Sequence, residues 1–232
     1  MFWDREIEAL PRPELEALQL ARLLRTVRRV GEHVPFYQTL FREMGLDPAS
    51  VRTLADVRRL PFTTNADLRA SYPDGLLVKG PEQVVRLHTS SGTTGKPKAL
   101  FFSRKDVDQA AELTARCLVM TGASQHDVLQ NMMTYGLFTG ALVMHYGAEK
   151  VGLLVIPAGP GNSERQLMLM QDFGSTVIHT TPSYALYFAD FLERKGIDPR
   201  KDLRLRTGLI GAEPYTEETR QKIEEALGIT VF

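Results

Sequence analysis

Apolar residues recur at helical spacing in the first third of the chain. In the segment ELEALQLARLLRTVRRV, residues 14–30, one helix face carries Leu15, Leu18, Leu23, Val27 and Val30. Pro13 suits a first helical turn, and Gly31 is placed to end the helix in a left-handed conformation. Shorter helices are predicted in PFYQTLFREMG, which ends at Gly45, and after Thr64 in NADLRAS. Residues 1–79 are therefore expected to form a mostly helical segment.

From residue 84 the pattern changes to short β-rich runs that alternate with amphipathic stretches. Strands are predicted in VVRLHTS, ALFF, DVLQNMM, VGLLVIPA, STVIHTT and LRTGLIG, and helices over 163–173, 182–195 and 216–227. This alternation is typical of an α/β fold, with a mixed or parallel sheet flanked by helices. Residues 80–232 are expected to form one core. Because the last residues, ITVF, read as a strand that directly follows Gly228, this core is expected to be incomplete at its C-terminus.

The segment between the second strand and Gly122 is predicted to be a helix. Ser103 and Asp106 have the spacing of a capping box, and Gly122 stops the helix. One face is expected to carry Val107, Ala110, Thr114, Cys117 and Thr121. Cys117 is therefore expected to fill the core.

The composition excludes several classes of protein. Of 232 residues 43% are hydrophobic, and 28 basic side chains balance 28 acidic ones, so nucleic acid is not an expected partner. No run approaches the 18 or so apolar residues of a membrane helix, and no membrane association is expected. The single cysteine is compatible with a reducing compartment, which favours the cytoplasm. The five histidines lack paired ligand spacing, so no metal site is expected in this chain.

One segment between two predicted strands carries most of the chemical information. It reads Ser90-Ser91-Gly92-Thr93-Thr94-Gly95-Lys96-Pro97-Lys98. Its glycines let the backbone approach a ligand closely, and its hydroxyls and lysines can bind phosphate oxygens. It is not a Walker A loop, which needs glycine at the position of Ser90 and serine or threonine at the position of Pro97. By composition alone, a Ser/Thr/Gly turn of this kind is more often a flexible hairpin loop than a nucleotide site.

This segment resembles the phosphate loop of the acyl-adenylate-forming superfamily. Further stretches resemble phenylacetate-CoA ligases, in order and over nearly the whole chain: PFYQTLFREMGLDP, LPFTTNADLRASYP, YGLFTGALVMHYGAE, ERQLMLMQDFGSTVIHTTPSYAL and IGAEPYTEETR. The resemblance covers only the N-terminal part of that family. In such ligases the segment that matches ITVF leads into an acidic residue and a Tyr-Gly-x-Ser/Thr-Glu motif.

The resemblance implies roles for three sets of residues. The triphosphate of ATP would be held by Ser90, Ser91, Gly92, Thr93, Thr94, Gly95 and Lys96, with Thr94 and Lys96 as catalytic residues. The adenine would lie along Gly211, Ala212, Glu213 and Pro214. An aromatic acid would be enclosed by Tyr135, Gly136, Phe138, Thr139, Gly140 and Ala141. Without the resemblance, the last two segments would read as a strand-to-helix turn and a buried helix start.

The implied reaction has two steps. A carboxylate and Mg²⁺-ATP give an acyl-adenylate and pyrophosphate, and the thiol of coenzyme A then displaces AMP, as in aromatic-acid degradation. The implied magnesium-binding glutamate and catalytic C-terminal lysine have no counterpart before Phe232, so the chain alone is expected not to complete catalysis. Two alternatives stay open: an adenylating enzyme for another acid or acceptor, such as a deazaflavin-adenylylating synthetase, and a non-catalytic nucleotide-binding fragment. Unpaired strand edges favour a homo-oligomer, such as a dimer.

Overall fold

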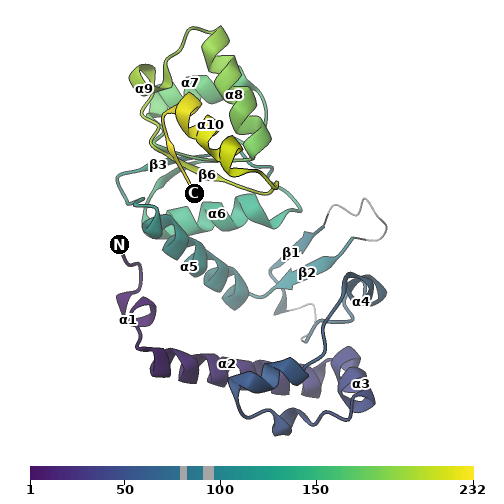
Figure 1. Ribbon diagram of the computed structural model, residues 1–232. Coiled ribbons are helices and arrows are strands. Elements are labelled where there is room, and N and C mark those ends of the chain that lie inside the picture. The colour runs from purple at the N-terminus through teal and green to yellow at the C-terminus, as the bar shows by residue number, and fades with distance from the viewer. Residues whose placement is uncertain (79–82, 91–96) are drawn as a thin grey trace. The chain divides into compact units, whose positions relative to one another are not determined.

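The computed structural model describes residues 1–78, 83–90 and 97–232, and these residues form two compact units. The N-terminal unit comprises Asp4–Asp106, and the C-terminal unit comprises Val107–Phe232 together with Met1–Trp3. Figure 1 shows their elements in chain order. The assignment of nucleotide and acid binding to residues 80–232 stays a prediction.

A parallel sheet forms the centre of the C-terminal unit. Its strand order is β4 (Leu154–Ile156), β3 (Val128–Asn131), β5 (Val177–Thr180), β6 (Thr207–Ile210) and β7 (Thr230–Val231). Each neighbouring pair is parallel, with Leu129 opposite Val155 on one side and Val177 on the other. Parallel strands have both faces covered, which explains why these segments read as apolar runs rather than as alternating patterns. The predicted α/β fold is confirmed.

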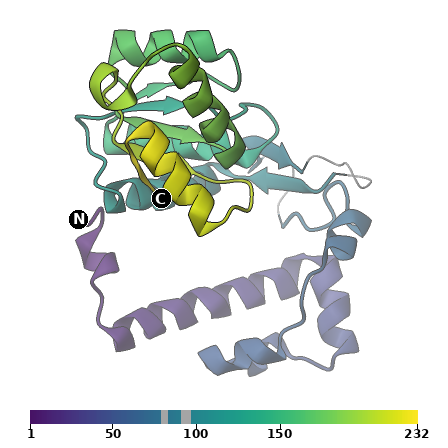
Figure 2. The same cartoon turned by 45° about the horizontal axis from the view of Figure 1, so that its top comes forward.

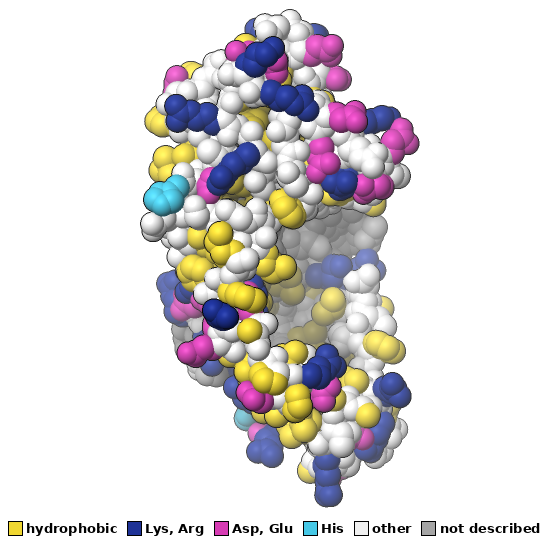
Figure 3. Space-filling view, turned by 60° about the vertical axis from the view of Figure 1, so that its left-hand side comes forward, with side chains coloured by type: hydrophobic (Ala, Val, Ile, Leu, Met, Phe, Trp, Pro, Cys, Tyr) yellow, Lys and Arg dark blue, Asp and Glu magenta, His cyan; other side chains and the backbone are white. Residues whose placement is uncertain are grey.

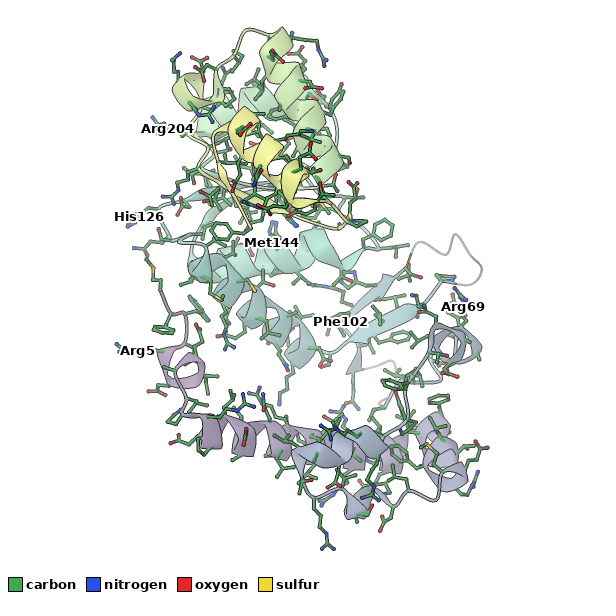
Figure 4. The ribbon with its side chains drawn as sticks, in the orientation of Figure 1. Arg5, Arg69, Phe102, His126, Met144 and Arg204 are labelled. Carbon is green, nitrogen blue, oxygen red and sulfur yellow. The ribbon has the colours of Figure 1, made fainter. Side chains whose placement is uncertain are left out.

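Helices cover both faces of this sheet (Figure 2). On one face lie α5 (Arg104–Met120) and α6 (Thr139–Val151). Leu118 of α5 and Ala148 of α6 form a buried cluster with Val177 of β5. Met144 of α6, labelled in Figure 4, packs against this cluster. The other face is covered by α7 (Ser163–Phe173), α8 (Pro182–Arg194) and α10 (Glu217–Leu227), whose side chains pack with Ile178 of the same strand. Val177 and Ile178 thus point to opposite faces, as period-two geometry requires.

The N-terminal unit is built from helices and one hairpin. Its helical elements are α1 (Arg5–Glu8), α2 (Arg12–His33), α3 (Pro35–Glu43), α4 (Asn65–Ala70) and the 3₁₀ segments η1 (Pro48–Ser50) and η2 (Leu54–Arg59). Val27, Phe41, Leu46 and Val51 form its buried cluster. β1 (Arg86–Thr89) and β2 (Ala99–Phe102) pair antiparallel, and the ring of His88 meets the ring of Phe102, labelled in Figure 4, edge-on.

The helix boundaries agree closely with the sequence pattern, with two corrections. The helices predicted over 163–173, 182–195 and 216–227 are observed as α7, α8 and α10, and a further short helix, α9 (Pro199–Asp202), precedes β6. Gly31 does not end α2, which continues to His33; the absence of a side chain instead lets α2 approach Pro48 and Phe41, since a Cβ at Gly31 would lie 3.0 Å from Pro48 Cγ.

The second correction concerns Cys117, which is exposed and does not fill the core. The buried side of α5 instead carries Val107, Ala111, Ala115 and Leu118, one position away from the predicted face over most of its length. The predicted capping box is present, since Asp106 accepts from the Ser103 backbone N–H at 2.9 Å and the Ser103 hydroxyl accepts from Asp106 N–H at 3.3 Å.

Candidate functional site

The phosphate-loop segment connects β1 and β2. Backbone N–H of Ser90 donates to the carbonyl of Lys98 at 3.1 Å, and Lys98 N–H donates to the Ser90 hydroxyl oxygen at 2.9 Å. These two bonds, one to a backbone carbonyl and one to a side-chain hydroxyl, hold the two ends of the segment together just beyond the β1–β2 pairing. Lys98 Nζ donates to Asn65 Oδ1 of α4 at 3.0 Å. The remaining predicted phosphate-binding residues, Ser91, Gly92, Thr93, Thr94, Gly95 and Lys96, lie outside the described residues.

A cavity of about 360 Å³ opens at the carboxyl ends of the central strands of the C-terminal unit. Three segments at the carboxyl ends of strands contribute to it: residues 132–134 after β3, residues 180–181 at the end of β5, and Ala212 after β6. The full lining is Met132, Met133, Thr134, Phe138, Gly140, Ala141, Pro160, Thr180, Thr181, Tyr184 and Ala212. A mostly apolar wall with a few hydroxyls suits a small ligand that has an apolar body and one polar end.

The predicted acid-binding segment forms one wall of this cavity. Phe138 is the N-cap of α6, and Gly140 and Ala141 in its first turn line the cavity. Tyr135, Gly136 and Thr139 do not line it. The Tyr135 hydroxyl instead contacts Asn131 Nδ2 at 2.8 Å and His145 Nδ1 at 3.0 Å, and burial raises the pKa of Tyr135 to about 12.

The predicted adenine-binding segment leaves the sheet at the same edge. Gly211 N–H donates to the carbonyl of Thr180 at 3.2 Å, which extends the β5–β6 pairing. Ala212 lines the cavity with a φ of +70°, a left-handed conformation that is uncommon for a residue with a side chain. The Glu213 carboxylate accepts from the backbone N–H and the hydroxyl of Ser183, at 3.2 and 2.9 Å. Gly211, Glu213 and Pro214 do not line the cavity.

Two buried amides next to the cavity were not among the predicted site residues. Asn131, at the end of β3, is fully buried and contacts His179, Tyr135 and Ala141. Gln166 of α7, also fully buried, donates from Nε2 to the carbonyls of Gly159 and Gly161, which flank the cavity-lining Pro160. Their only signal in the sequence is polarity within an otherwise apolar pattern.

His179 lies beside Asn131 on β5, and its Nδ1 is 3.0 Å from Asn131 Oδ1. Burial lowers the pKa of His179 to about 4, so the imidazole is neutral at pH 7. From the sequence alone, His179 could either line the cleft or be a core histidine with a satisfied partner. The structure gives it a partner and does not place it among the cavity-lining residues.

The described residues include no group of three or more side chains of the kind that binds a metal ion, and none of their helices is long and apolar enough to cross a membrane. Acidic and basic side chains are interspersed on the face of the C-terminal unit seen in Figure 3.

The chain belongs to the family of AMP-binding enzymes, whose family model matches residues 26–232. Among curated proteins, the phenylacetate-coenzyme A ligase of Thermus thermophilus is 46% identical over 99% of this chain and 51% of its own length. That of Escherichia coli is 44% identical over 97% of this chain and 52% of its own length. The resemblance to phenylacetate-CoA ligases is thus confirmed, and the chain spans about half the length of these relatives.

Solved structures agree with this assignment. A 2-hydroxyisobutyryl-CoA ligase in complex with 2-HIB-AMP and CoA superimposes with a TM-score of 0.92 at 26% identity, over 99% of this chain and 55% of that one. The same ligase in its thioesterification state gives a TM-score of 0.92 at 27% identity, over 99% of this chain and 50% of that one.

Proposed function

We propose that this chain forms the ATP- and acid-binding part of an aryl-acid–CoA ligase that acts on phenylacetate or a close analogue. The observation that carries the proposal is the cavity at the carboxyl ends of β3, β5 and β6. It brings residues of the predicted acid segment, Phe138, Gly140 and Ala141, together with Ala212 of the predicted adenine segment. The apolar wall suits an aromatic ring, and a cavity of about 360 Å³ has the size of a small-ligand site.

The proposed reaction joins two anions, so it depends on charge neutralisation and positioning. The acid's carboxylate attacks the α-phosphorus of ATP, pyrophosphate leaves, and the thiol of coenzyme A later displaces AMP. The triphosphate would be held by the segment from Ser90 to Lys96, with Thr94 and Lys96 as catalytic residues, and Mg²⁺ would enter with ATP. The adenine would lie along Gly211, Ala212, Glu213 and Pro214. Coenzyme A is the proposed second substrate.

Calorimetric titration with Mg²⁺-ATP tests the nucleotide half of this proposal. The matched variant combines Thr94→Ala and Lys96→Ala, and a Lys98→Ala variant serves as the comparison because the Lys98 ammonium is bonded to Asn65. We expect binding by the original chain and by Lys98→Ala, and loss of binding in the double variant. Equal binding by all three would contradict the assignment of the phosphate loop.

A panel of acids tests the other half. Phenylacetate should bind more tightly than acetate, because acetate leaves the apolar wall uncovered, and it should also bind more tightly than a deazaflavin. Tighter binding of the deazaflavin would favour the adenylylating alternative.

We further propose that the chain forms a homo-oligomer, since β4 and β7 are the edge strands of the sheet. A monomeric mass by light scattering would contradict this. A cytoplasmic location stays a prediction from the single cysteine.

A further inference from the structure

Asn131 is the most fully bonded side chain beside the cavity. Its Oδ1 accepts from the backbone N–H of Met133 at 3.3 Å and lies 3.0 Å from His179 Nδ1. Its Nδ2 donates to the Tyr135 hydroxyl and to the carbonyl of Ala141, both at 2.8 Å. A carboxamide has two donor hydrogens and two acceptor lone pairs, so every hydrogen-bonding position of Asn131 is used. This one side chain joins β3, β5, the following loop and α6.

One assignment of donors and acceptors satisfies all of these contacts together. Because the amide nitrogen only donates, the Tyr135 oxygen accepts from Asn131, and its own hydrogen is directed to His145 Nδ1. His145 therefore carries its hydrogen on Nε2, which donates to Glu149 Oε1 at 3.1 Å. His179, whose partner is an amide oxygen, carries its hydrogen on Nδ1. The two histidines are thus assigned opposite tautomers.

The two groups to which Asn131 donates bracket one wall of the cavity. Tyr135 precedes the lining residues Phe138 and Gly140, and the Ala141 carbonyl follows them in the first turn of α6. Gly136, between Tyr135 and Phe138, has a φ of +147° and adds no side-chain contact that could stiffen the loop. The position of this wall relative to β3 therefore depends on Asn131.

We propose that Asn131 is a positioning residue for the acid: held by His179, it fixes Tyr135 and the start of α6, and thereby the wall on which the acid's ring packs. The inference rests on the proposed function in taking this cavity as the acid site. Asn131 itself does not line the cavity, so its effect on the acid passes through Tyr135 and Ala141.

The hydrogen-bond network can be tested without any ligand. In ¹⁵N spectra of the histidines near pH 7.5, His179 should show the Nδ1–H tautomer and His145 the Nε2–H tautomer. The opposite tautomer at His179 would overturn the bonding that the proposal needs, because Asn131 Oδ1 would then face a nitrogen that carries no hydrogen.

The effect on the acid is tested by calorimetric titration with phenylacetate. Asn131→Asp keeps the shape and removes both donor hydrogens, and Tyr135→Phe keeps the ring and removes the hydroxyl. Each single variant should weaken binding roughly tenfold, because a buried partner is lost in each case. The double variant should be little worse than Asn131→Asp alone, because the two residues act through one contact. Tyr135→Phe carries the test if Asn131→Asp does not fold.

Thr176→Val is the matched control. Thr176 lies at the other end of the β3–β5 pair, where its hydroxyl donates to Asp127 and accepts from Val128 N–H at 3.1 Å. This variant should lose stability but bind phenylacetate within about twofold of the original chain. Unchanged binding in Asn131→Asp and Tyr135→Phe, or an equal loss in the control, would overturn the positioning role. If the original chain itself binds no arylacetic acid, the proposed function fails as well, which distinguishes the two failures.

Discussion

Two glycines of α6 should respond to the same substitution with opposite signs. Gly140 lies in the first turn, and a Cβ added there would meet nothing within 4 Å. Gly147 is buried against α5, where an added Cβ would lie 2.5 Å from Thr114 Cβ, 2.6 Å from Thr114 Cγ2 and 3.1 Å from the Ala115 backbone nitrogen. Carbon atoms in contact are normally about 3.5–4.0 Å apart, so α5 and α6 would have to separate by roughly 1 Å.

The magnitude at each site follows from two opposing terms. Alanine is favoured over glycine inside a helix by about 1 kcal/mol, and by about half of that in a first turn. Overpacking a core contact costs about 1–3 kcal/mol, and the upper end applies at Gly147 because the backbone fixes the Thr114 Cβ and a β-branched side chain on a helix has a restricted χ1. Gly147→Ala should therefore destabilise the protein by about 2 kcal/mol, and Gly140→Ala should stabilise it by about 0.5 kcal/mol.

Urea denaturation followed by circular dichroism measures both values, and the thermal midpoint of Gly147→Ala should fall by about 4–8 °C. Adding Thr114→Gly removes both colliding carbon atoms, so the double variant should be more stable than the sum of the single effects predicts. Because Gly140 lines the cavity, its variant should also bind phenylacetate more weakly. A Gly147→Ala protein as stable as the original would refute the reasoning, since it would show that the α5–α6 contact can relax freely.

Three further predictions concern the core and its titratable groups. Leu192→Ala, at a fully buried position on α8, should cost about 2–5 kcal/mol in urea denaturation. Burial opposes ionisation of Asp127, but hydrogen bonds from Thr176 and Ser124 and the charge of Arg206 lower its pKa on balance. Asp127→Asn should therefore destabilise the protein at pH 7. The difference in stability between this variant and the original chain should shrink below about pH 4, where acid protonates Asp127. The pKa of His179 is about 4, below the value of a histidine in the unfolded chain. The free energy of unfolding should therefore fall as the pH drops from about 6.5 to 4. In a series of denaturation curves at different pH values, His179→Asn should show a weaker pH dependence.

Local signals in the sequence predicted the helices and strands well because caps and glycines act within a few residues. Asn162, Thr181 and Thr216 each cap the helix that the pattern placed after them, and Gly174 and Gly228 end α7 and α10 in left-handed conformations. Gly31 and Cys117 were misread because their environments depend on tertiary packing. Gly31 lies against Pro48 and Phe41, and the buried face of α5 is set by contacts with α6 and the sheet.

The candidate site was only partly predictable for the same reason. The resemblance to known ligases indicated Phe138, Gly140, Ala141 and Ala212, all of which line the cavity. It did not indicate that Tyr135 lies behind this wall, because that position results from a hydrogen bond to Asn131 on β3 and from another to His145 on α6. Such contacts join segments whose spacing in the sequence carries no periodic pattern.

The position of the cavity follows from the order of the strands. After β3 the chain forms α6 and adds β4 on one side of β3, and after β4 it forms α7 and adds β5 on the other side. The connections that leave the carboxyl ends of β3 and β5 also diverge across opposite faces of the sheet, since α6 packs on one face and α8 on the other. Such a divergence leaves a crevice outside the carboxyl ends of the two strands, where open parallel sheets bind their ligands. Residues 132–134 after β3 and residues 180–181 at the end of β5 line this crevice, and Asn131 and His179 lie next to these residues as a cross-strand pair. The topology therefore places Asn131 and His179, a hydrogen-bonded cross-strand pair, at the point where the connections that follow β3 and β5 diverge.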